Sequence, residues 1–158
     1  MMAENKNNDD SRRNYRIKVE FADFFQWGLY QIKPVVPDTE YSGDPNRPGP
    51  QRRDDQTGLP IWRLPVTDAG EPNSRRASYD VYLLSDTDPV PGTQEFGRGM
   101  RPIALEGVTV QPRIGGQGEY KFIQYVVRAT GFSELPSTGG RSGGSGSAGG
   151  SASGKTAS

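Results

Sequence analysis

The chain of 158 residues contains neither cysteine nor histidine. It therefore cannot form disulfides, thiolate or imidazole metal sites, or Ser-His and Cys-His nucleophile pairs, and it lacks the usual general base at neutral pH. Carboxylates alone can serve a glycosidase or a magnesium site. However, the acidic residues stand mainly in turn-like contexts, such as Asp54-Asp55 and Asp86-Thr87-Asp88. The sequence favours a protein that is not an enzyme and needs no metal or other cofactor.

The sequence also has no net charge and no long hydrophobic run. Lysine plus arginine and aspartate plus glutamate number 19 each, so any attraction for nucleic acid must come from a local patch. No apolar run approaches the roughly 20 residues of a membrane span, and the polar start has no apolar signal core. We expect a cytoplasmic protein with no membrane partner.

Glycine and proline divide the chain into regions. Many of the 21 glycines fall in Gly139 to Ser158, a stretch of mainly Gly, Ser and Ala that offers little apolar surface to bury. We expect a disordered tail over residues 137–158 and a flexible polar arm over residues 1–14. Residues 15–136 match the size of one domain with one modest core. A small β domain with one long tail is a layout similar to that of bacterial single-stranded-DNA-binding proteins, although this tail lacks their acidic, apolar tip.

Alternating apolar and polar residues predict an all-β domain. The six expected strands cover residues 15–21, 24–36, 61–66, 78–84, 103–114 and 119–130, with long loops at 37–58 and 85–102 and no helix. Five or six strands with long connections predict a small OB-like barrel, and a small β-sandwich is the alternative. Pro65 indicates an edge or a bulge in its strand.

The same alternation assigns side chains to faces. It places Trp62, Leu64 and Val66 toward the core and Arg63 away from it, and it sets Tyr82 opposite Tyr79 and Val81. Over residues 24–33 it sets Phe25, Trp27 and Leu29 against Phe24, Gln26, Tyr30 and Ile32. One of these two faces exposes aromatics, unless other elements cover both.

Binding of a nucleic acid strand needs aromatic faces for base stacking and cations for the phosphates. Outward aromatics and loop arginines are the candidates, and loops in these positions flank the groove of an OB barrel. We expect a groove between the 37–58 and 85–102 loops; the alternative is that these arginines are solvated charges offset by neighbouring acids. The candidate nucleic-acid-binding residues are Trp27, Tyr30, Arg47, Arg52, Arg53, Arg63, Tyr82, Arg98 and Arg101.

Four short motifs occur between about Phe21 and Phe132. They are Phe25-Gln26-Trp27-Gly28 with Val35-Val36-Pro37, Thr57-Gly58-Leu59-Pro60-Ile61-Trp62, Leu105-Glu106-Gly107-Val108-Thr109-Val110-Gln111-Pro112, and Val127-Arg128-Ala129-Thr130-Gly131. Together they resemble the plasmid replication, integration and excision activators of integrating conjugative elements of actinomycetes. The resemblance implies a role in maintaining mobile-element DNA and carries over no binding residue.

Two functions follow as expectations. In the first, the protein is a nonenzymatic accessory that binds single-stranded DNA through an OB-like groove. In the second, it is a protein-interaction or regulatory module that acts on a replication, recombination or integration partner without touching DNA. A homo-oligomer fits either function.

Overall fold

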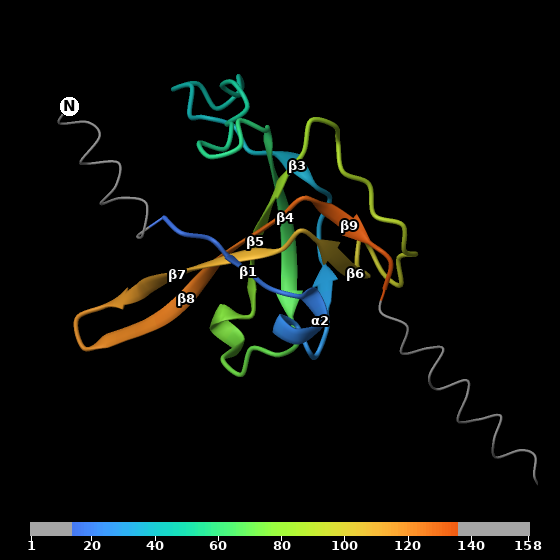
Figure 1. Ribbon diagram of the computed structural model, residues 1–158. Helices are drawn as coiled ribbons and strands as arrows, with labels where there is room; N and C mark the ends of the chain where they lie inside the picture. The colour runs from blue at the N-terminus through green and yellow to red at the C-terminus, as the bar shows by residue number, and fades with distance from the viewer. Residues whose placement is uncertain (1–13, 136–158) are drawn as a thin grey trace, which may run out of the picture.

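The structure, a computed structural model, describes residues 14–135 and is built mainly of β-strands (Figure 1). The expected arm, apart from Asn14, and the expected tail over 137–158 lie outside the described residues. None of the described helices is long and apolar enough to cross a membrane.

Nine strands pair into one sheet. Their order is β1-β7-β8-β5-β4-β2-β6-β9, with β3 attached to β4 beside β2. All pairs are antiparallel except β5 with β8. The strands are β1 (Ile17–Lys18), β2 (Leu29–Gln31), β3 (Val36–Pro37), β4 (Ile61–Asp68), β5 (Ser78–Leu84), β6 (Arg101–Glu106), β7 (Thr109–Gln117), β8 (Tyr120–Ala129) and β9 (Gly131–Ser133). Two short helical turns, α2 (Phe21–Phe24) and the 3-10 turn η1 (Ser74–Arg76), complete the elements.

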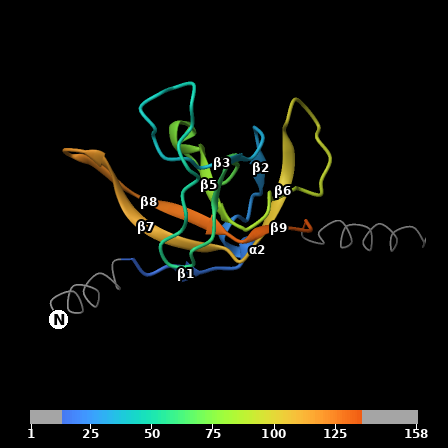
Figure 2. The ribbon, with the colours of Figure 1, turned by 90° about the horizontal axis from the view of Figure 1, so that it is seen from above.

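The structure has nine strands where five or six were expected, because the segment expected as one strand at 24–36 contains β2 and the start of β3, and because two long strands are interrupted at bends. Only Gly107-Val108 separates β6 from β7, and only Thr130 separates β8 from β9. The register continues across both interruptions, because Glu106 pairs with Gly131 and Thr109 with Arg128. At the bend Gly107 has a φ of 64°, and a Cβ there would overlap the Thr130 side chain. The sheet therefore curls into an open half-barrel, from which the β7–β8 hairpin extends outward (Figure 2).

The core lies inside the curl. Its fully buried side chains include Leu29, Leu64, Val66, Val81, Leu83 and Val127. The alternation predicted for the strand at 61–66 is confirmed, since Leu64 and Val66 are buried, Trp62 packs against the core and Arg63 is exposed.

The prediction of one long strand over residues 24–36 is wrong. The chain instead forms α2, a turn and then the three-residue β2, so Phe25 and Leu29 are buried whereas Trp27 is exposed. Helical spacing lets the Phe25 ring contact that of Phe21, four residues earlier, with centroids 5.1 Å apart, and the ring of the adjacent Phe24 lies 5.0 Å away. Gly28, at a φ of 93°, turns the chain into β2. Clustering of the phenylalanines at one end of the core outweighs the period-two pattern.

Two further expectations are corrected. The strand predicted over residues 15–21 shrinks to Ile17–Lys18, because the helical turn begins at Phe21. Of the edge and the bulge expected for Pro65, the edge is wrong, because Pro65 lies inside β4, which has partners on both sides. Four residues, 32–35, stand opposite the two residues Leu64 and Pro65, so the ladder is irregular at this point. The Pro65 carbonyl oxygen accepts the Ile32 N–H at 3.0 Å in the interval between β2 and β3. On that side no ladder bond requires the N–H that proline lacks.

Candidate nucleic-acid interface

A groove runs over the outer face of β4 and β5, between the 37–60 loop and the β7–β8 hairpin. It encloses about 710 Å³. The loop is well ordered by backbone hydrogen bonds: Glu40 donates to Pro50, Arg52 to Asp38 and Ile61 to Arg52, at 2.7 to 3.0 Å. This ladder holds Arg52 and Arg53 at one wall of the groove. The side chains lining the groove are those of Asp38, Glu40, Arg52, Arg53, Asp54, Asp55, Ile61, Arg63, Asp80, Tyr82, Arg113, Val126 and Arg128.

The floor of the groove carries one aromatic residue between two arginines. Tyr82 on β5 pairs with Arg63 on β4 and with Arg128 on β8. Residues directly paired across a sheet point to the same face, and neighbouring strands lie about 4.8 Å apart. The Tyr82 side chain thus leaves the sheet between the side chains of Arg63 and Arg128, whose Cα atoms lie about one strand spacing away on either side.

The groove has equal numbers of positive and negative side chains, but several of its arginines form no close ion pair within the part of the chain that the structure describes. Five arginines and five carboxylates line it. Arg52 lies 3.8 Å from Asp38, and Arg63 lies 3.6 Å from Asp38 and 3.8 Å from Asp80, distances too long for hydrogen bonds. Among the described residues, Arg113 forms no ion pair with a carboxylate. These exposed guanidinium groups keep N–H donors for an anionic ligand.

Asp54 is held by a residue from outside the groove. Arg16 donates to both of its carboxylate oxygens at 2.9 and 2.6 Å, and Thr57 donates through its backbone N–H and its hydroxyl at 2.9 and 2.8 Å. Burial by itself raises the pKa of Asp54, but the hydrogen bonds from Arg16 and Thr57 outweigh it and lower the pKa to about 2. Asp54 therefore stays ionised and ties the groove loop to the segment before β1.

Arg128 is the most enclosed cation of the floor. Burial, and then repulsion from Arg16, lowers its pKa below the ordinary arginine value, while Asp54 acts in the opposite direction. Its guanidinium donates to the Gln111 amide oxygen at 2.9 Å. This hydrogen bond directs the Arg128 side chain toward β7.

The structure brings together four of the nine predicted site residues, namely Arg52, Arg53, Arg63 and Tyr82. None of the groove-lining residues comes from the 85–102 loop, so the second wall is the β7–β8 hairpin. Arg113 and Arg128 of that hairpin were missed in the sequence. The alternation of β8, with Val127 and Ala129 buried, is the signal that places Arg128 outward.

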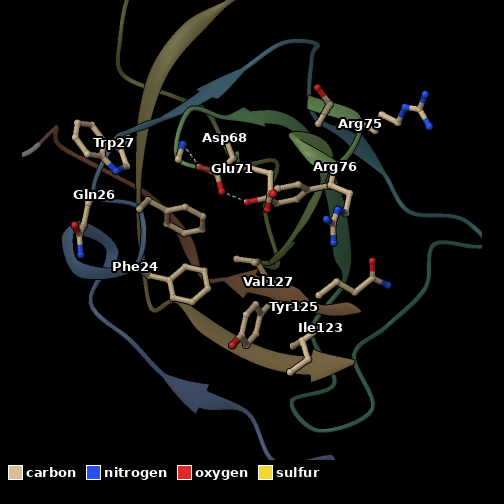
Figure 3. Close-up of a pocket in the computed structure, with 15 residues that line it drawn as sticks. Phe24, Gln26, Trp27, Asp68, Glu71, Arg75, Arg76, Ile123, Tyr125 and Val127 are labelled. Atoms are coloured by element: carbon tan, nitrogen blue, oxygen red, sulfur yellow. Dashed lines mark hydrogen bonds between the residues drawn. The ribbon is translucent and has the colours of Figure 1, made fainter. Parts of the chain in front are cut away.

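The other five predicted residues lie elsewhere. Arg47 and Arg98 are exposed in loops. Arg101 donates to the Thr93 carbonyl at 2.6 Å and to Glu95 at 2.8 Å, and so fastens the 85–100 loop. Tyr30 packs edge-to-face on Phe96 at 6.1 Å. Trp27 lies in a separate cleft on the other side of β8 (Figure 3).

In comparisons with known proteins, no family model, curated protein or solved structure matches this chain.

Proposed function

We propose that the protein is a nonenzymatic accessory factor that binds single-stranded DNA in the groove over β4 and β5. The resemblance of its motifs to plasmid replication, integration and excision activators suggests that this binding serves mobile-element DNA. Three features of the fold and the groove support the proposal, and each is open to test.

The strand pairing supports an OB-type barrel. If β6 with β7, and β8 with β9, each count as one bent strand, and the two-residue strands β1 and β3 are set aside, five strands remain. The first, β2, pairs with the second and fourth, and the third, β5, runs parallel to the fifth. In a partly open OB barrel the face of the second and third strands, with the loops beside it, binds oligonucleotides. The groove occupies that face.

The row Arg63–Tyr82–Arg128 is the observation that carries the proposal. A ring offers a stacking face to any base, and cations on both sides can track the phosphates. Arg52, Arg53 and Arg113 extend the cationic surface along both walls. Such a site reads no base edges, so we expect little sequence preference.

Fluorescence anisotropy with a labelled oligo-dT of about 16 nucleotides, the upper end of OB site sizes, tests the groove. Replacing Arg52 and Arg53 together by Ala should weaken binding to all sequences and make the salt slope shallower by up to about 0.7 for each phosphate that no longer meets an arginine. Tyr82→Ala should cost about 1–3 kcal/mol with little change in slope, because it removes stacking and no charge.

Two matched controls accompany these variants. Tyr82→Phe keeps the ring and should bind like the wild type, and Arg98→Ala removes an exposed arginine outside the groove. If the groove variants bind as tightly as the controls while circular dichroism shows an intact fold, the groove is not the site. If the wild type does not bind at low salt, the alternative of a protein-interaction module replaces the proposal.

A further inference from the structure

A second cleft lies on the opposite face of β8, between the hairpin, the Phe24–Trp27 segment and η1. It encloses about 550 Å³, within the range of ordinary ligand pockets. Figure 3 shows Phe24, Tyr125 and Val127 directed into it, with Trp27 and Arg76 at opposite sides. The Phe24 and Tyr125 rings meet edge-to-face at 5.4 Å and form its apolar floor.

The apolar wall continues beyond the core along the hairpin. Val110 and Val127 are buried partners, and the next pairs on the same face are Pro112 with Tyr125 and Ile114 with Ile123. Ile114 and Ile123 are 74% and 67% exposed, and Trp27 is 73% exposed. Large apolar side chains gathered beside a concave surface mark a site for another molecule.

The acidic side chains that line the cleft already accept hydrogen bonds within the protein. Asp68 accepts from the Tyr79 hydroxyl and from the Gly70 N–H, both at 2.9 Å, and Glu71 accepts from the Asn73 N–H at 3.0 Å. Both oxygens of Asp68 and one oxygen of Glu71 thus accept hydrogen bonds from the chain itself.

The two arginines that line the cleft, Arg75 and Arg76, have no such partners among the acidic side chains of residues 14–135. The Arg76 guanidinium carbon lies over the Phe122 ring, 4.0 Å from its centroid, a contact with the ring face that takes up no N–H donor in a hydrogen bond. Among the described residues, neither Arg75 nor Arg76 forms an ion pair with a carboxylate. The charged donors of the cleft lining are therefore available, and a ligand that brings carboxylates complements them.

We propose that this cleft docks an acidic segment of a partner protein, with an aromatic or aliphatic side chain as its anchor. The anchor enters between Phe24, Trp27 and Tyr125, and a flanking carboxylate receives the donors of Arg76. Tryptophan, tyrosine and arginine around an apolar centre form the composition typical of interface hot spots. The inference is independent of DNA binding, because the groove and the cleft share no lining residue.

The test uses the full chain and a fluorescein-labelled peptide with Leu-Phe at its centre and Asp and Glu on both sides. Arg76→Glu and Ile123→Ser should each weaken binding about tenfold or more. Arg98→Glu, a matched charge reversal far from the cleft, and the Arg52→Ala/Arg53→Ala groove variant should stay within about twofold. Bound peptide should also shift the wild-type tryptophan emission, and Trp27→Phe should abolish the shift because Trp62 packs against the core. Circular dichroism and the unfolding midpoint confirm that each variant folds.

Several results would overturn the proposal. They are absence of saturable binding at low salt, equal binding of peptides carrying Lys for the acids or Ser-Ser for Leu-Phe, or an Arg76→Glu variant no weaker than Arg98→Glu. If oligo-dT displaces the peptide and Arg76→Glu also weakens DNA binding, the cleft belongs to the nucleic acid path. If the protein sediments as a dimer that Ile123→Ser dissociates, a second copy occupies the cleft.

Discussion

Replacing Asp54 by Asn should destabilise the protein through the cation it leaves behind. The Arg16 and Asp54 side chains are 10% and 2% exposed, and the carboxylate receives both guanidinium donors. Removing one partner of a buried ion pair typically costs about 3–5 kcal/mol, because the other charge remains desolvated. Asp55, 3.3 Å from Arg16, offsets part of this loss, so we expect about 3 kcal/mol. That is a large share of the roughly 5–15 kcal/mol of a typical domain.

The pH dependence gives a second, independent magnitude. The pKa of Asp54 falls from 3.8 to about 2 on folding. At about 1.4 kcal/mol per pKa unit, this corresponds to about 2 kcal/mol. Because the folded pKa is the lower one, the stabilisation is fully present above the unfolded pKa of 3.8 and is lost as the pH falls through about 2. The wild type should lose this increment over that interval, and Asp54→Asn should not.

Urea unfolding of both proteins, at neutral pH and at a series of acidic pH values, measures the two effects. A double variant, Arg16→Met with Asp54→Leu, serves as control because it removes both charges, and it should recover most of the lost stability. The reasoning fails if Asp54→Asn unfolds within about 1 kcal/mol of the wild type, or if the double variant is as unstable as the single one.

Two further predictions concern the hairpin tip and a buried hydroxyl. Gly116 and Gly118 both have left-handed φ values, of 84° and 62°, but only at Gly116 would a Cβ overlap the Tyr120 carbonyl. Gly118→Ala should therefore cost only the roughly 1–2 kcal/mol of a left-handed backbone. Gly116→Ala adds the overlap to that cost and should lower the urea midpoint clearly more. Equal midpoints would contradict this. Burial, with Asp68 nearby, raises the pKa of Tyr79 above its ordinary value. Tyr79→Phe should therefore leave the tyrosinate absorbance of the folded protein unchanged up to alkaline unfolding, and a lost increment below that point would refute the assignment.

The sequence predicts the regular strands well because their burial alternates. The strand at 78–84 has the expected bounds, and Leu64 and Val66 point inward as predicted. Alternation fails at residues 24–36 because aromatic residues on successive positions fit a helical turn as readily as a strand, and contacts distant in sequence decide between the two. Phe24, for example, packs against Tyr125.

The candidate site was predictable only in part, for a topological reason. Arg63 and Tyr82 lie on antiparallel strands that follow one another in the sequence, and strand alternation alone puts both on the outer face. Arg128 joins them only because β8 runs parallel to β5 in the sheet. No local pattern specifies that parallel contact. The second wall of the groove was therefore assigned to the 85–102 loop and not to the hairpin.

A neutral net charge is compatible with a local anion-binding surface, because carboxylates differ in how fully the chain occupies them. Both oxygens of Asp54 accept hydrogen bonds from Arg16 and Thr57, so its charge is compensated within the protein. Asp38 meets Arg52 and Arg63 only at 3.6 to 3.8 Å, beyond hydrogen-bond distance. A count of charges treats these carboxylates alike, whereas an arriving phosphate competes only with the loosely held pairs. The arrangement of the acids, more than the number of arginines, therefore decides where an anion can bind.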